Sequence, residues 1–322
     1  MEQLEPVAGT HLTPAQILLV EAALLESKSA NTRRTYASAL RGFTAWCAMQ
    51  GHQAVPAEPA VVAAYLVTLA SNHSMSTVTV AAASIRDIHL SEGHRDPCAS
   101  RGVSTVLAGL RRKLGTAPAH QARAIELSEL KRILSSMDRS TIAGKRDAAI
   151  LLVGFASAMR RSELAAMVRR DVRLSVDGVR IRIQRSKTDQ NGEGVIIGLP
   201  AGKNDETCPL RALRIWLGAR GGSTNDAVFT RVSRTGSVLA GSLTPQSMNL
   251  ILKSRARAAG VDMTGLSVHG LRSGHITAAN RAGVNLTDIM RTSRHTSVKV
   301  LLSYVRENDV LDGNNSGGSL GL

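Results

Sequence analysis

The hydrophobic positions in the first part of the chain have helical spacing. Apolar side chains recur every three or four residues in five segments, and capping or turn-forming residues separate these segments. The five predicted helices begin at Thr13 and at Asn31, follow the break at Pro56–Pro59, and span Ser76–Leu90 and Arg101–Leu114. Because no alternating polar and apolar pattern occurs before residue 125, this part of the chain is predicted to be an all-α bundle.

The rest of the chain mixes helical and alternating patterns. Glu126–Met137 and Arg146–Ala158 have helical periodicity, and the second is so apolar that we expect it at the centre of a domain. Alternating segments rich in Val and Ile follow, separated by turn formers, and they predict a small three-stranded antiparallel sheet. These segments are Asp171–Leu174, Val179–Gln184 and Gly194–Leu199. After Pro209 the pattern is helical again, apart from Gly/Ser-rich stretches near 220–224 and 234–242, so this domain is predicted to be α+β.

A short polar segment separates the two patterns. Gly115–Ala124 is built of small and polar residues and is interrupted by Pro118. We therefore expect a helical domain over residues 1–114, a linker over 115–125 and a second domain over 126–322. The last residues, Asp312–Leu322, consist mainly of turn formers, and we expect them to be mobile.

The charge indicates a polyanionic partner. The net charge is +15, of which residues 1–125 supply +3 and residues 126–322 supply +12. Such a balance is typical of nucleic-acid binding, although a solvated basic surface is the alternative. Aromatic residues make up only 2% of the chain, which argues against single-strand binding by base stacking and favours duplex DNA held by its phosphates.

The cysteines and the apolar runs indicate a cytoplasmic protein. Cys47, Cys98 and Cys208 are far apart and odd in number, so reduced thiols are expected. Met1–Gly9 is acidic and lacks the apolar core of a secretory signal. No apolar run approaches the roughly 20 residues of a membrane span.

Two basic residues in the second domain are placed for phosphate chemistry. Arg160 follows the apolar helix and begins another, where its planar fork can be aimed at two phosphate oxygens. Glu163, one turn later, can orient Arg160 or another site residue. Lys187 lies in a predicted hairpin turn, from which it can protonate an oxygen that leaves phosphorus. Taken singly, a surface Arg–Glu pair and a solvated hairpin lysine are the simpler interpretations.

A His–Arg pair follows in Val268–His275. His269 and Arg272 are three positions apart and share a face if the segment is helical, while Gly270, Ser273 and Gly274 permit close backbone approach. The alternatives are an ordinary polar helix face or a metal site. A metal site would take its ligands from His269, His275 and His295, but it lacks a carboxylate at metal-ligand spacing and a HExxH pattern.

The last candidates are His295 and Tyr304, nine positions apart. A helix is predicted from about Thr296, with Tyr304 at its end. We expect its apolar stripe to pack it against the domain; the stripe comprises Val298, Val300, Leu301 and Val305. A half-buried packing role is the alternative for Tyr304.

Together these residues predict DNA cleavage through a covalent bond between Tyr304 and phosphorus. Preorganised side chains at Arg160, Arg272 and His269 would stabilise the charge of the transition state. A phenol has a pKa of about 10, so a histidine or a nearby lysine must accept its proton during attack. Side chains supply the positive charge, so neither a metal nor another cofactor is required. The phosphotyrosine bond conserves energy for rejoining without ATP.

The order R…K…HxxR…H…Y resembles that of the tyrosine recombinase (phage integrase) family along the whole chain. The match is closest to the Cre-like branch, through Pro56–Pro59, Tyr65-Leu66, Ile289-Met290 and Tyr304–Arg306. The resemblance implies a helical core-binding domain followed by a catalytic domain. It also implies that Arg160 and Arg272 bind phosphate, that Lys187 protonates the leaving oxygen and that Tyr304 is the nucleophile. His295 stands where Cre has Trp, and the Gly/Asn/Ser-rich tail replaces Cre's apolar C-terminal helix.

The predicted function is site-specific recombination through a 3′-phosphotyrosine intermediate and a Holliday junction. The expected partners are double-stranded DNA with an inverted-repeat site and three further copies of the chain, which would form a tetramer on DNA through Val305–Leu311. The candidate DNA contacts are Arg33, Arg34, Arg41 and Arg86. The alternatives are a topoisomerase IB-like enzyme, an inactive DNA-binding regulator, a metal-dependent relaxase and a nucleoid-type binder.

Overall fold

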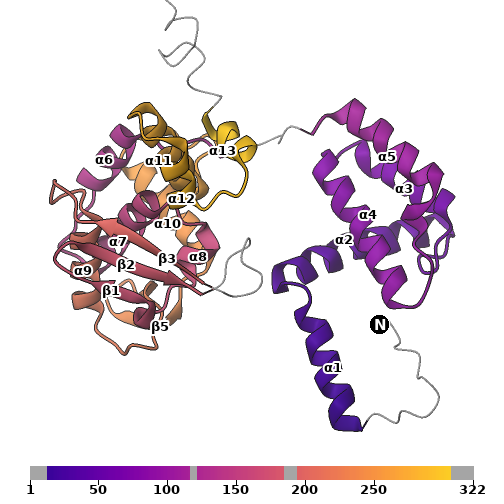
Figure 1. The fold of residues 1–322 in the computed structure, drawn as a ribbon, viewed down its shortest axis with the longest axis horizontal. Coiled ribbons are helices and arrows are strands. Elements are labelled where there is room, and N and C mark those ends of the chain that lie inside the picture. The colour runs from indigo at the N-terminus through magenta and orange to yellow at the C-terminus, as the bar shows by residue number, and fades with distance from the viewer. Residues whose placement is uncertain (1–12, 117–121, 185–193, 306–322) are drawn as a thin grey trace, which may run out of the picture. The chain divides into compact units, whose positions relative to one another are not determined.

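The chain divides into two compact units, Met1–His120 and Gln121–Leu322. The structure is a computed structural model of all 322 residues, and it describes residues 13–116, 122–184 and 194–305 (Figure 1).

The first unit is helical throughout its described residues. Its α-helices are α1 (Pro14–Glu26), α2 (Ala30–Gln50), α3 (Pro59–Ala70), α4 (Met75–Ser91) and α5 (Arg101–Leu114), with a 3-10 turn η1 (Pro97–Ala99) before α5. These bounds confirm the five helices that hydrophobic spacing predicts. The core contains an aromatic cluster, in which the Tyr65 ring centroid lies 5.0 Å from that of Phe43 and 5.5 Å from that of Trp46.

Helix α1 forms as predicted, but three apolar residues in its first half are exposed. Thr13 caps it, since the Gln16 amide donates to Thr13 Oγ1 at 3.3 Å and the Thr13 amide donates to Gln16 Oε1 at 2.8 Å. Ile17, Leu18 and Leu19 are nonetheless 44%, 66% and 71% exposed. Periodicity therefore predicts the helix correctly, while these three apolar side chains remain exposed.

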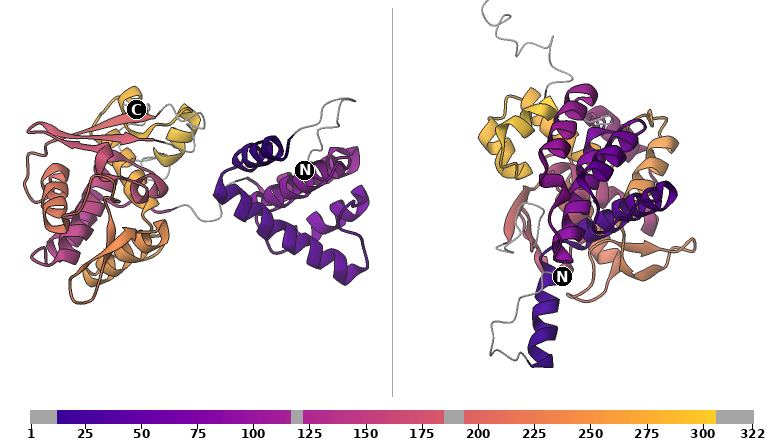
Figure 2. Two further views of the ribbon diagram at one scale, coloured as in Figure 1. Left: turned by 90° about the horizontal axis from the view of Figure 1, so that it is seen from below. Right: turned by 90° about the vertical axis from the view of Figure 1, so that its right-hand side faces the viewer.

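The second unit combines helices with two small sheets. Its α-helices are α6 (Leu127–Ser135), α7 (Ile142–Ser157), α8 (Arg161–Ala165), α9 (Pro209–Arg220), α10 (Pro245–Ala258), α11 (His269–Arg281), α12 (Leu286–Ser293) and α13 (Val298–Val305), with a 3-10 turn η2 (Arg169–Asp171). The predicted antiparallel sheet has the order β1-β2-β3, formed by β1 (Val172–Leu174), β2 (Gly178–Ile183) and β3 (Val195–Pro200). Its register pairs Ile181 with Val172 on one side and with Ile197 on the other. Figures 1 and 2 show this sheet along one side of the helices.

A second, two-stranded sheet was not predicted. It pairs β4 (Thr230–Val232) with β5 (Val238–Ser242) in antiparallel fashion. The first strand is only three residues long, and the second falls within a Gly/Ser-rich stretch, so neither has the alternating pattern that marks a half-buried strand.

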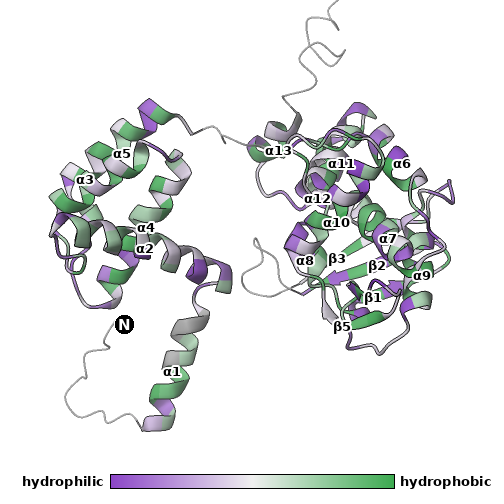
Figure 3. Cartoon of the chain, turned by 180° about the vertical axis from the view of Figure 1, so that it is seen from behind, coloured by the Kyte–Doolittle hydropathy of each residue, from purple (hydrophilic) through white to green (hydrophobic). Residues whose placement is uncertain are grey.

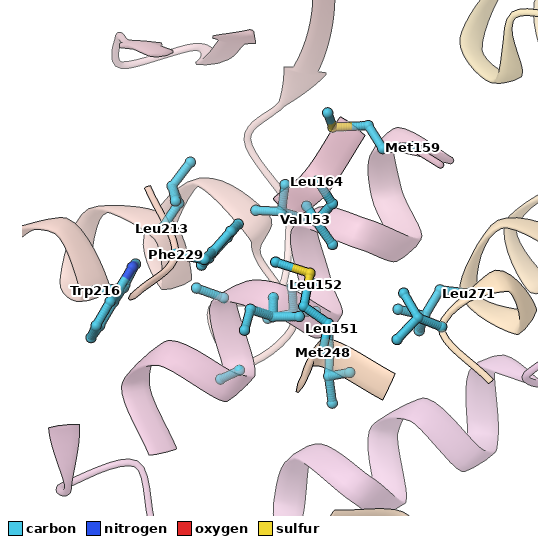
Figure 4. Close-up of a cluster of buried hydrophobic side chains, with 14 of the residues drawn as sticks. Leu151, Leu152, Val153, Met159, Leu164, Leu213, Trp216, Phe229, Met248 and Leu271 are labelled. Atoms are coloured by element: carbon cyan, nitrogen blue, oxygen red, sulfur yellow. The ribbon is translucent and has the colours of Figure 1, made fainter. Parts of the chain in front are cut away.

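Helix α7 forms the centre of the second unit, as its apolar character predicts. Figure 3 shows it as largely hydrophobic, and every residue from Arg146 to Gly154 is buried. In Figure 4, its side chains Leu151, Leu152 and Val153 lie in one cluster with residues of the surrounding elements. The surrounding members that the figure labels are Met159, Leu164, Leu213, Trp216, Phe229, Met248 and Leu271.

The end of the expected linker is part of the second unit. The Arg123 amide donates to the Gly265 carbonyl at 3.1 Å, and the Ile125 amide donates to the Gly270 carbonyl at 3.0 Å. A Cβ added at Gly274 would lie only 2.1 Å from the Ile125 carbonyl oxygen. Residues 123–125 therefore lie directly against α11, which is the close backbone approach that the small residues around Arg272 predict.

Cys47, Cys98 and Cys208 are free thiols. In the part of the chain that the structure describes, no helix has both the length and the apolar character needed to cross a membrane.

Candidate active site

Arg160 is positioned by a left-handed turn between α7 and α8. Ala158 ends α7 with φ 48° and ψ 29°, a conformation that reverses the chain direction, and Arg160 then stands immediately before α8. The Glu163 carboxylate accepts from the Arg160 guanidinium, Nη1 to Oε1, at 2.8 Å, and from the Arg160 amide at 2.8 Å. Glu163 thus holds both the backbone and the side chain of Arg160, the orienting role that its spacing predicts.

Arg272 lies on α11 and is 1% exposed. Its Nη1 donates to the Ala158 carbonyl at 2.6 Å, which fixes the guanidinium against the turn that precedes Arg160. Burial, and secondarily the positive charges of Arg160 and Arg294, lower the pKa of Arg272 to about 10. Arg272 therefore remains a cation at pH 7, in surroundings that strengthen its attraction for an anion.

His269 faces the hydroxyl group of Tyr304. The distance from His269 Nε2 to Tyr304 Oη is 3.1 Å. Burial, and secondarily the charges of Arg272, Arg161 and Arg160, lower the pKa of His269. A neutral imidazole at hydrogen-bond distance can accept the phenolic proton, so His269 is placed to act as a general base toward Tyr304.

His295 is held in one tautomer by a chain of hydrogen bonds. Ser293 Oγ donates to the Ile289 carbonyl at 2.6 Å, so it accepts from His295 Nδ1, 2.8 Å away. Arg272 Nη2 lies 3.1 Å from His295 Nε2, which therefore accepts. Burial, followed by the charge of Arg272, lowers the pKa of His295 to about 4, so the ring is neutral at pH 7.

Helix α13 presents Tyr304, but by fewer apolar contacts than predicted. Leu301 is fully buried beside Ile276 and Ile289, and Tyr304 packs partly against this cluster. Val298 and Val300 are 47% and 48% exposed, so the prediction that they pack α13 against the domain is wrong. Leu301 is the residue of α13 that is buried against α11 and α12, and Val298 and Val300 lie outside this cluster. The side chain of Val305 lies outside the described structure.

The structure brings five of the six predicted catalytic residues into connected contacts, although they come from distant parts of the sequence. His269 contacts Tyr304, whose ring centroid lies 5.3 Å from that of His295, and Arg272 contacts His295. Glu163 binds both Arg160 and Arg294, and Arg294 immediately precedes His295. Lys187 lies in the segment 185–193, outside the described residues. Among the described residues, no three His, Cys, Asp or Glu side chains are arranged to hold a metal ion. His275 instead packs its ring edge-on against Phe155, with centroids 6.0 Å apart.

Sequence reasoning missed Ala158, Ser293 and Arg294. The Ala158 carbonyl binds Arg272 and the Ser293 hydroxyl binds His295. Neither contact can be predicted from an alanine or a serine at these positions. Arg294 donates to Glu163 from Nη2 at 2.6 Å, and its side chain is 8% exposed. Its place immediately before His295 was the available signal, but a buried arginine cannot be distinguished from a surface one by spacing alone.

The candidate DNA-contact arginines differ in their surroundings. Arg34 lines a groove of about 900 Å³ in the first unit, together with residues from α2, α3 and α4. Arg33 Nη1 donates to the Lys28 carbonyl at 3.1 Å, and the exposed Arg41 lies two positions before the buried Phe43 on α2. Arg86 Nε lies 3.3 Å from Asp96 Oδ2. Arg34 is therefore the one of these four that lines this groove.

The chain is similar to known proteins over most of its length. Residues 123–310 match the model of the phage integrase family. The chain is 31% identical over 299 residues to an integrase/recombinase xerD homolog of Selenomonas ruminantium, covering 90% of this chain and 86% of that protein. It is 28% identical over 300 residues to recombinase cre of Escherichia phage P1, covering 87% and 85% of the two chains.

A solved structure shares the fold. The crystal structure of a lambda integrase(75–356) dimer bound to a COC' core site superposes with a TM-score of 0.60 at 17% identity, covering 93% of this chain and 97% of that one. The chain therefore belongs to the phage integrase family and is a tyrosine site-specific recombinase. This result confirms the resemblance that the order of the catalytic candidates indicates.

Proposed function

We propose that this recombinase cleaves duplex DNA by attack of Tyr304 Oη on a phosphodiester, which leaves a 3′-phosphotyrosine bond and a free 5′-hydroxyl. The observation that carries the proposal is the 3.1 Å distance between Tyr304 Oη and a neutral His269 Nε2 beside two fixed arginines. The tyrosine forms the bond to phosphorus, and the leaving 5′-oxygen departs with a proton.

Each residue has a distinct part in the proposed step. Arg160 and Arg272 bind the nonbridging phosphate oxygens, and their charge stabilises the transition state. His269 accepts the phenolic proton, while His295 donates no proton at pH 7 and orients the Arg272 guanidinium. Lys187 protonates the leaving oxygen, by the role that the family resemblance implies. In the reverse direction a 5′-hydroxyl of another strand attacks phosphorus and releases Tyr304.

The DNA substrate and the assembly follow from the same chemistry. We infer that the protein binds a double-stranded inverted-repeat site and that four copies assemble on two duplexes, because exchange through a Holliday junction needs one nucleophile for each of four strands. Two of the similar solved structures bear on this: one is a lambda integrase dimer bound to a COC' core site, and another is a lambda integrase tetramer bound to a Holliday junction. The candidate exchange segment Val305–Leu311 lies almost entirely outside the described residues.

The test uses a nicked duplex that carries the recombination site, so that a cleaved fragment diffuses away and the covalent complex accumulates. The wild type should give a complex that survives denaturing electrophoresis. Tyr304→Phe removes only the hydroxyl group and should bind the same DNA without forming this complex. A covalent complex with the Tyr304→Phe variant would place the nucleophile on another residue. Activity that disappears with EDTA would favour the metal-dependent relaxase.

A further inference from the structure

Arg294 has a backbone conformation that arginine rarely adopts. Its φ is 57° and its ψ is 43°, in the left-handed region where a side chain is strained and glycine is not. It ends α12 and directly precedes His295. A strained, non-glycine residue that persists next to a reactive centre is held by its surroundings, which points to a function for the side chain.

The side chain of Arg294 points into the protein, toward Glu163. Nη2 donates to Glu163 Oε2 at 2.6 Å, and Nη1 donates to the Thr292 carbonyl at 3.1 Å. Both partners of the ion pair are nearly inaccessible, with Arg294 at 8% and Glu163 at 2% side-chain exposure. Water therefore screens this pair very little, and the pair joins α8 to the α12–α13 turn across 131 positions of sequence.

Glu163 consequently binds two arginines at once. One carboxylate oxygen accepts from the Arg160 guanidinium, and the other accepts from Arg294 and from the Arg160 amide. With one arginine, Glu163 would cancel the charge of Arg160. With two, the described cluster of Arg160, Arg272, Arg294 and Glu163 retains two positive charges, because His269 and His295 are neutral. Before attack the bound phosphodiester carries one negative charge, and further negative charge develops on its oxygens in the transition state, which this excess stabilises.

We propose that Arg294 is a positioning residue of the cleavage site, whose ion pair with Glu163 fixes Arg160 and the His295 turn in one geometry. This role rests on the cleavage function proposed above. Arg294 does not contact the phosphate in this arrangement. It acts through Glu163 on Arg160, and through the backbone on His295 and thereby on Arg272.

Arg294→Gly removes the side chain but keeps the backbone conformation, because glycine adopts φ 57° without strain. Its effect therefore reports the loss of the side chain alone. Arg294→Lys retains the charge but cannot form both hydrogen bonds of the planar fork. Arg291→Ala is the control: Arg291 lies three residues earlier, pairs with Asp288 at 2.6 Å and is 82% exposed, so its loss removes the same charge outside the site.

The first measurement is the single-turnover rate of covalent complex formation on the nicked duplex. Arg294→Gly should lower it by roughly 10-fold or more while DNA affinity changes little, because small misplacements of a phosphate-binding group have large effects. Arg294→Lys should be intermediate, and Arg291→Ala should stay within about two-fold. Adding Arg294→Gly to Glu163→Gln should cost much less than Arg294→Gly alone. An Arg294→Gly rate within about two-fold of the wild type, or independent effects in the double variant, would overturn the proposal.

The second measurement needs no activity, and it separates this proposal from the proposed function. The imidazole NMR signals of His295 should shift in both Arg294→Gly and Glu163→Gln, and its pKa should rise in Arg294→Gly, where a nearby positive charge is lost. Neither change should occur in Arg291→Ala. Thermal unfolding establishes that each variant is folded. If the wild type forms no covalent complex, the cleavage function fails, and the NMR titration still decides whether Arg294 positions His295. Unchanged His295 signals in a folded Arg294→Gly would reject the positioning role.

Discussion

The Arg272 guanidinium donates a 2.6 Å hydrogen bond to the carbonyl of Ala158, 114 positions earlier in the chain. Ala158 adopts a left-handed conformation, and it directs the next residues so that Arg160 begins α8. This hydrogen bond therefore fixes both the buried Arg272 and the turn that positions Arg160. The two proposed phosphate-binding arginines are parts of one structure, and their substitution has different consequences.

Arg160→Ala and Arg272→Ala should each slow covalent complex formation by roughly 10²-fold or more, because each removes a charge that stabilises the transition state. Only Arg272→Ala should also lower the melting temperature strongly, since it empties a buried volume and leaves the Ala158 carbonyl without its partner. Arg234→Ala is the control, since Arg234 is exposed near the turn between β4 and β5. Cleavage at a near wild-type rate by either variant would reduce that arginine to a structural role.

The packing of α11 against residues 123–125 gives a prediction about stability. Gly274→Ala would place a methyl carbon 2.1 Å from the Ile125 carbonyl oxygen, so the backbone must shift, and we expect a loss of roughly 2 kcal/mol or more in the free energy of unfolding. Gly218→Ala, on the exposed side of α9, would meet nothing within 4 Å and should instead stabilise by up to about 1 kcal/mol. Chemical denaturation of the two variants measures both. Equal stabilities would show that residues 123–125 do not pack against α11 in solution.

The sequence predicts the elements of this protein better than it predicts the contacts between them. The helices of the first unit, the apolar α7 and the sheet β1-β2-β3 are visible because each has the periodicity of its own secondary structure. Motif order identifies Arg160, His269, Arg272, His295 and Tyr304, since each lies in a recognisable local context. The exposure of Val298 and Val300 was not predictable, because burial depends on what covers a face.

Tertiary contacts explain the residues that were missed. Arg294 is buried as the ion-pair partner of Glu163. The Ala158 carbonyl accepts from Arg272, and the left-handed backbone conformation of Ala158 cannot be predicted from an alanine in the sequence. The β4–β5 sheet is held by pairing of a short strand with a Gly/Ser-containing one. Such features depend on residues distant in sequence, and a local pattern contains no information about them.

The two histidines give a prediction about pH. The pKa of His295 is lowered to about 4 and that of His269 is also lowered, in both cases chiefly by burial. A group whose pKa is lower in the folded state contributes stability that is fully present above its unfolded pKa of about 6.5 and is lost as the pH falls toward the folded value. The free energy of unfolding of the second unit should therefore fall between about pH 6.5 and pH 4. In the His295→Gln variant it should fall less over that interval.

The rate of cleavage should also fall at acidic pH. Because neutral His269 accepts the phenolic proton in the proposed step, the rate of covalent complex formation should persist somewhat below pH 6.5 and fall only as His269 becomes protonated. His269→Gln should lower the rate and remove this acidic limb from the pH profile. An unchanged limb in the His269→Gln variant would assign the base to another group, such as a lysine.

The last prediction concerns DNA sequence preference, for which the first unit offers two arginines in different surroundings. Arg34 lines the groove of about 900 Å³ beside Ser76 and Thr77 of α4, whereas Arg86 is paired with Asp96, 3.3 Å away. We expect Arg34→Ala to relax preference at particular base pairs by about 1–3 kcal/mol, the usual worth of a bidentate arginine contact, without slowing cleavage of a bound site. Arg86→Ala should leave preference unchanged. Competition binding against single base-pair variants of the site, at several salt concentrations, measures both effects. If Arg34→Ala instead weakens binding equally for all sequences and reduces the salt dependence by about one phosphate contact, Arg34 holds the backbone and the bases are recognised elsewhere.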